Sequence, residues 1–172
     1  LKKIGDMRAI GGLAAIAAHD ENPGLREVAA EAVASMKGDC SCKDGCAGCQ
    51  GMEMTPARAY LGLAYRYYKR DSAVIRNYLD GYTLWNWKDG DLTFRKVPSY
   101  LYHLELAEEA IFDALHEEPA NQTARSMLAA IYFAQWGAVQ ALSGEAKESD
   151  EAQETAERLW NVLPLAAAQG TD

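Results

Sequence analysis

Apolar residues recur at three- and four-residue spacing along most of this chain, which is the period of an amphipathic α-helix. Two segments, Asn22-Pro23 and Thr55-Pro56, combine a capping residue with a proline at the first helical position. The pattern predicts an all-α protein of about seven helices. We expect helices from near Met7, from Pro23 to Gly38, from Pro56 to Tyr68, from Asp71 to Tyr82, from Ser99 to His116, from Asn121 to Val139 and from Lys147 to Leu163.

The apolar stripes of these helices predict which side chains are buried. Each stripe should face the neighbouring helices and form the core. The stripes of the second and third helices are Leu25, Val28, Ala29, Ala32, Val33 and Met36, and then Tyr60, Leu61, Ala64, Tyr65 and Tyr68.

One stretch departs from the helical period and predicts a β-hairpin near residues 84–97. Asp89-Gly90 is a strong two-residue turn, because a type I′ turn needs positive φ at both positions. The turn places Trp85 opposite Phe94 and Trp87 opposite Leu92, so one face of the hairpin is apolar. Two strands alone are marginally stable, and the apolar face should therefore pack on a helix or on a partner. We expect packing on the chain's own helices; Trp85, Trp87 and Phe94 are nevertheless candidate partner-binding residues, because aromatic side chains dominate interface hot spots.

The charge of the chain is concentrated in its last third. The 172 residues carry a formal charge of −8. Residues 1–101 hold 14 basic and 12 acidic residues, a net +2, and residues 102–172 hold 3 basic and 13 acidic residues, a net −10. The acidic excess argues against nucleic-acid binding. It predicts a solvated helical face or a docking surface for a basic partner.

The N-terminal segment resembles a known helical repeat. Asp20, Pro23 and Arg26 fit the Asp-x-x-Pro-x-x-Arg turn between two helices, and Gly5-Asp6 recurs as Gly38-Asp39. Residues 1–39 therefore resemble a HEAT repeat of the phycobilisome-lyase-like type. Residues 40–54 form a Cys-rich connection.

The region 55–172 resembles tetratricopeptide (TPR) repeats. Residues 107–132 read like a TPR junction, with Pro119, Leu128, Ala129 and Tyr132 at consensus-like positions. The same spacing recurs 67 residues earlier at Ala57, Leu61, Gly62 and Tyr65. Together the resemblances imply an α-solenoid of HEAT-like and TPR-like helix pairs, with the hairpin as an insertion. Such repeats usually bind proteins on an extended surface.

The four cysteines lie within ten residues, in the pattern C-x-C-x₃-C-x₂-C. They are Cys40, Cys42, Cys46 and Cys49. Four thiolates suit a tetrahedral, structural Zn²⁺ site. Two disulfides, an iron–sulfur cluster and free thiols are the alternatives. A metal site would indicate a cytoplasmic location and disulfides an extracytoplasmic one.

No fingerprint of a common enzyme family is present, and His19, His103 and His116 are scattered along the chain. No apolar run is long enough to span a membrane. The sequence predicts a non-catalytic interaction scaffold or a subunit of a larger assembly, with protein partners or copies of itself. The rival hypotheses are a redox or metal-handling protein that uses the four cysteines, and an accessory helical domain of an enzyme complex.

Overall fold

The computed structural model describes residues 5–37, 54–75, 81–88 and 90–169. These residues are mostly helical and include a small two-stranded antiparallel hairpin, as the sequence predicts. A 3₁₀ turn at Met7–Ala9 precedes the main elements. They are α1 (Ile10–His19), α2 (Pro23–Lys37), α3 (Pro56–Tyr68), β1 (Gly81–Lys88), β2 (Asp91–Pro98), α4 (Ser99–Glu117), α5 (Gln122–Gln140), α6 (Glu145–Glu148) and α7 (Asp150–Gln169).

Side-chain caps start three of the helices where the sequence indicates them. Asn22 Oδ1 accepts the Gly24 N–H at 2.9 Å, ahead of α2. Thr55 Oγ1 accepts the Arg58 N–H at 3.3 Å, and Asn121 Oδ1 accepts the Ala124 N–H at 3.0 Å. These acceptors pair with amide groups that have no partner inside the helix, and they set its first residue.

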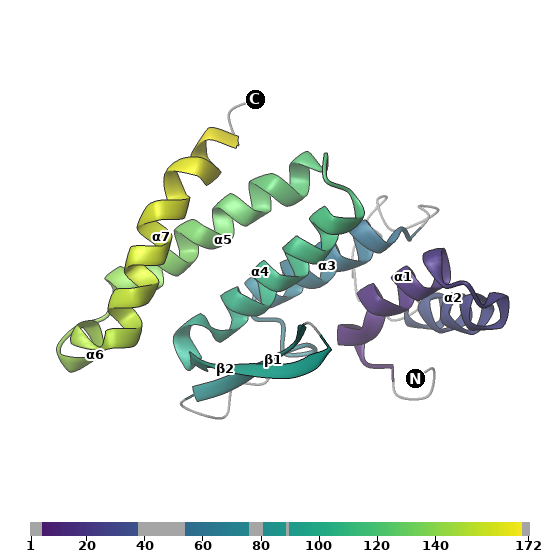
Figure 1. The fold of residues 1–172 in the computed structure, drawn as a ribbon, viewed down its shortest axis with the longest axis horizontal. Helices are drawn as coiled ribbons and strands as arrows, with labels where there is room; N and C mark the ends of the chain where they lie inside the picture. Colours follow the sequence, from purple (N-terminus) through teal and green to yellow (C-terminus); the bar gives the residue numbers. More distant parts are fainter. Residues whose placement is uncertain (1–4, 38–53, 76–80, 89, 170–172) are drawn as a thin grey trace.

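The main helices follow one another in a row in the order α2, α1, α3, α4, α5, α7, and each packs chiefly on its neighbours in that row (Figure 1). The hairpin lies across one end of α4. The contact between α1 and α3 is close because Gly11 faces Tyr60: a Cβ at Gly11 would lie 2.4 Å from the tyrosine ring. A larger residue at Gly11 would push the two helices apart.

The core has two parts. The larger joins α3, α4, α5, α7 and the hairpin, and its most buried side chains include Leu101, Ile111, Ile131 and Leu159. The smaller joins α1, α2 and Ala59 of α3. Helix α3 therefore contributes to both parts of the core.

This double role overturns part of the burial prediction. Tyr67 is buried in α3, whereas Tyr65 is 55% exposed. A helix that packs on two neighbours buries a wider surface than a single apolar stripe. The middle of that buried surface therefore lies at other residues than the stripe predicts. In α2, Ala29, Ala32, Val33 and Met36 are buried as predicted. Leu25 and Val28 are exposed, because α2 lies at the end of the row and packs mainly on α1.

The prediction of a helix from Asp71 to Tyr82 is also wrong at its C-terminal end, and its positions 76–80 lie outside the described residues. The Asp71 carbonyl accepts the N–H groups of Val74 and Ile75 at 3.0 and 2.9 Å, which makes one turn. Strand β1 already begins at Gly81, and Tyr82 pairs with Val97. The apolar residues at 82 and 84 share one face of the hairpin, which fits the two-residue period of a strand. Pairing with β2 selects the strand over the helix in this segment.

Candidate interaction site

The hairpin has the register that the Asp89-Gly90 turn predicts. Trp85 lies opposite Phe94, Asn86 opposite Thr93, Trp87 opposite Leu92 and Lys88 opposite Asp91. Gly90 has φ +89°, a backbone conformation that glycine adopts without steric cost. The strands extend further than predicted, to Gly81 and Pro98.

One face of the hairpin, the inward face, packs on α4. Leu84 and Val97 are 4% and 2% exposed. The Tyr82 ring stacks on Tyr102 of α4, with ring centroids 4.1 Å apart. Arg95, opposite Leu84 in the register, also belongs to this face. Among its described side chains, the inward face thus combines a small apolar contact with the cation of Arg95.

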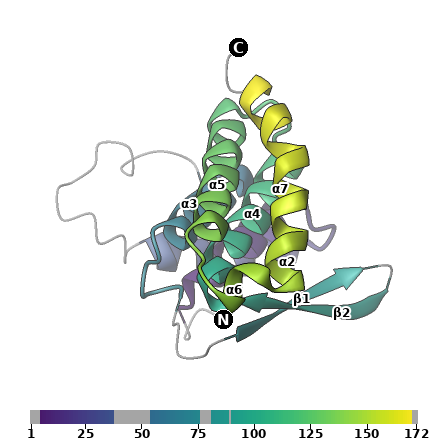
Figure 2. The same cartoon turned by 90° about the vertical axis from the view of Figure 1, so that its left-hand side faces the viewer.

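The opposite face, the outward face, includes Trp85, Leu92, Phe94 and Lys96, together with Thr83 and Trp87 by register. Trp85, Leu92 and Phe94 are 58%, 59% and 62% exposed, and the Trp85 and Phe94 ring centroids lie 5.1 Å apart. The hairpin projects beyond the helices (Figure 2). The expectation that the apolar face packs on the chain's own helices is therefore wrong for these residues. Trp87 belongs to the backbone register, and its side chain lies outside the described part of the structure.

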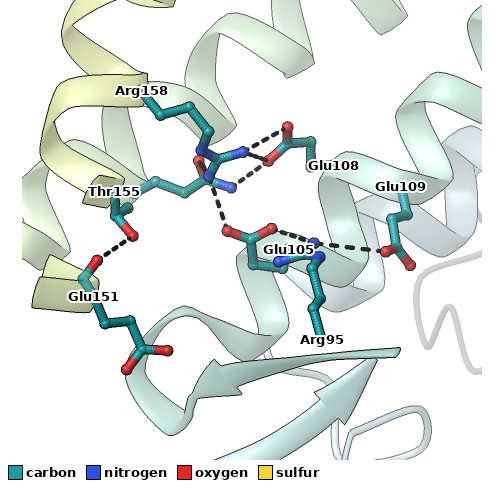
Figure 3. Close-up of polar contacts among 8 residues, drawn as sticks. Arg95, Glu105, Glu108, Glu109, Glu151, Thr155 and Arg158 are labelled. Atoms are coloured by element: carbon teal, nitrogen blue, oxygen red, sulfur yellow. Dashed lines mark hydrogen bonds and ion pairs between the residues drawn. The ribbon is translucent and has the colours of Figure 1, made fainter. Parts of the chain in front are cut away.

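A buried carboxylate on α4 favours this orientation of the hairpin, in which the larger apolar side chains face water. Glu105 is 3% exposed. Arg95 Nη2 donates to Glu105 Oε2 at 2.7 Å, and Arg158 Nη2 of α7 donates to Glu105 Oε1 at 2.9 Å (Figure 3). A buried carboxylate without a partner is costly. Turning the hairpin over would leave Glu105 with Arg158 as its one cation among the described residues and would expose Leu84 and Val97.

Glu108 extends this network toward α5. Gln135 is fully buried, and its Nε2 donates to Glu108 Oε2 at 2.7 Å. Arg158 Nη1 lies 3.3 Å from Glu108 Oε1. Burial, together with the negative charge of Glu108, raises the pKa of Tyr132 well above its usual value. The two glutamates are thus held between the hairpin, α5 and α7.

Sequence reasoning did not identify this network as a site, although a signal was present. Glu105 and Glu108 fall inside the apolar stripe of α4, and Gln135 lies between Ile131 and Val139 at four-residue spacing on α5. A polar residue inside an apolar stripe indicates a buried polar partner elsewhere. The stripe could not show that the partners would be arginines from β2 and α7.

Helix α4 also buries His103, which is 5% exposed. Arg70, at φ 54°, donates its Nε–H to His103 Nε2 at 3.1 Å. His103 Nδ1 is buried without a hydrogen-bond partner. Burial and the neighbouring Arg70 charge lower the pKa of His103 to about 4, so the ring is neutral near pH 7.

The remaining predicted positions are not brought to this site. His19 Nε2 lies 2.8 Å from Glu117 Oε2 and links α1 to α4. His116 is exposed in the last turn of α4. Cys40, Cys42, Cys46 and Cys49 fall outside the described residues. Among the residues that are described, no group of three or more His, Cys, Asp or Glu side chains is placed to hold a metal ion.

No protein-family model matches the chain, and neither a curated protein nor a solved structure is significantly similar to it. No helix in the described ranges is long and apolar enough to cross a membrane. The two buried glutamates pair with arginine and glutamine side chains, and this network attaches the hairpin to the helices. The outward face leaves three large apolar side chains facing water.

Proposed function

We propose that this chain is a non-catalytic protein-interaction module that binds a protein partner on the outward face of its hairpin. The observation that supports this proposal is the orientation of the hairpin, whose face with the larger apolar side chains points away from the chain's own helices. The inward face is anchored to α4, and Trp85, Leu92 and Phe94 are exposed on the other side. Clustered exposed apolar side chains characterise binding surfaces, and aromatic residues contribute most of the energy at hot spots.

The helical row supports the scaffold part of the proposal. An α-solenoid requires helices that pack mainly on their neighbours in a row, and the packing of this chain meets that requirement. We propose that the row is an α-solenoid, the fold that the HEAT-like and TPR-like segments suggest. We propose that the row serves as a rigid base from which the hairpin projects. In such a scaffold the C-x-C-x₃-C-x₂-C segment would staple the connection between α2 and α3, through Zn²⁺ or through disulfides. Metal analysis and thiol titration of the purified protein distinguish these two chemistries.

Site-specific photo-crosslinking tests the proposed function. A photoreactive amino acid replaces Phe94 in the native host, and a matched sample carries it at Val28, which is 65% exposed on α2. We expect a specific crosslinked protein from position 94 only. The purified partner should bind the wild-type chain and lose about tenfold or more in affinity to Phe94→Ser, with Val28→Ser unchanged.

Two results would contradict the proposed function. One is crosslinking at position 94 that is no more specific than at position 28. The other is a partner whose affinity does not change when Phe94 is replaced.

A further inference from the structure

We propose that the partner of the outward face is a second copy of this chain, which offers the exposed side of its helix α7. The contact is head to tail, because two different surfaces meet. This inference rests on the proposed function and names the occupant of its site.

The outward face has the composition of one half of an interface. Trp85, Leu92 and Phe94 form its apolar part, each more than half exposed. Lys96 lies on the same face by strand alternation and is exposed beside this apolar group. A surface that combines aromatic side chains with a cation favours a partner that is apolar and acidic.

Helix α7 offers that combination. It is the last helix of the row and packs mainly on α5 and on the short helix α6. Ala152 and Leu159 are buried on its inner side, whereas Trp160 and Leu165 are 68% and 66% exposed. The Trp160 ring lies against Trp136 of α5, with centroids 5.9 Å apart, which limits its motion and lowers the entropy lost on binding.

Charge favours a contact between the hairpin and α7 over the two symmetric alternatives. Residues 145–169 contain six acidic and two basic residues, a net −4. The hairpin, residues 81–98, contains three basic and two acidic residues, a net +1. Two α7 surfaces would repel each other, and two hairpins would gain no electrostatic attraction. Lys96 against Glu154 and Glu157, both exposed on α7, gives opposite charges at the edge of an apolar contact.

The positions of the two surfaces allow one chain to use both. The hairpin projects past the side of the helical row, and α7 forms the end of that row (Figures 1 and 2). One copy can therefore bind a neighbour through its hairpin and another through α7. A contact of this kind continues into a ring or an open assembly.

Sedimentation velocity across the micromolar range tests the proposal with two variants. Phe94→Ser damages only the hairpin surface, and Trp160→Ser damages only the α7 surface. We expect concentration-dependent association of the wild-type chain and about tenfold or greater weakening in each variant. An equimolar mixture of the two variants should form a 1:1 dimer and nothing larger, since the mixture retains one intact hairpin and one intact α7 surface.

The controls separate folding from association. Val28→Ser should associate like the wild type, and circular dichroism should show the wild-type helix content in all three variants. Lys96→Glu should weaken association, and combining it in a mixture with Glu157→Lys should restore part of the loss.

Two outcomes overturn the proposal: a wild-type chain that stays monomeric at every concentration, or variants that weaken association but do not recover when mixed. The first outcome, together with a crosslinked foreign protein at position 94, removes only self-association and leaves the proposed function standing. A monomeric chain without a specific crosslink removes both.

Discussion

The two faces of the hairpin differ in what holds them, although the same two strands supply both. The inward face has Leu84 and Val97 in the core and Arg95 on a buried carboxylate. The outward face has the larger apolar side chains, and they are exposed. Apolar surface alone would have placed Trp85 and Phe94 inside. We infer that a buried acid decides the orientation of this small sheet, because turning the sheet over would take Arg95 away from Glu105 and leave that carboxylate with Arg158 alone.

The largest expected effect comes from removing that acid. Glu105→Ala removes the carboxylate that Arg95 and Arg158 share, and among the described residues it leaves Arg95 only the longer ion pair with Glu109 at 3.7 Å. Because Arg95 and Arg158 are partly exposed and can be hydrated, we expect a loss of about 3 kcal/mol in the free energy of unfolding. Urea denaturation measures it. Glu154→Ala, an exposed position on α7, is the control and should change stability by less than about 0.5 kcal/mol. An equal, small effect of both substitutions would mean that Glu105 does not anchor the hairpin.

A matched pair of leucines compares the faces directly. Leu84→Ala removes a side chain that is 4% exposed, and Leu92→Ala removes one that is 59% exposed. We expect losses of about 2–3 kcal/mol and less than about 0.5 kcal/mol, respectively, because only the first opens a cavity in the core. Thermal and urea unfolding of the two variants provide the comparison. A larger loss for Leu92→Ala would reverse the assignment of the two faces.

Acid should weaken the helix on which the inward face rests. The folded-state pKa of His103 is about 4, below the value of 6.5 expected when the chain is unfolded. As the pH falls, the unfolded chain therefore takes up the proton first. The His103 contribution is complete above about pH 6.5 and is lost as the pH approaches 4, with about 2 kcal/mol lost by pH 5.

Unfolding measured at several pH values checks the His103 contribution. His103→Gln should flatten the stability curve between pH 7 and pH 5 relative to the wild type. A wild-type slope in His103→Gln would show that the ring is not held neutral.

Local chemistry explains which parts of the fold could be predicted. The caps at Asn22 and Thr55 and the Asp89-Gly90 turn act within a few residues, so the helix starts and the hairpin register follow from neighbouring positions. The burial of Tyr67 and the exposure of Tyr65 could not be predicted in this way. Helix α3 is buried between α1 and α4, and the helical period alone does not show whether a helix packs on one neighbour or on two.

By itself, the sequence determined that the chain is mostly helical, where its capped helices begin and which residues of the hairpin share a face. Only the tertiary structure decided which of those faces is buried. Alternation along a strand sorts side chains into two sets and is unchanged when the sheet is turned over. The choice depends on Glu105 and on Arg158, 53 residues further along the chain, and their proximity exists only after α4, α5 and α7 have packed.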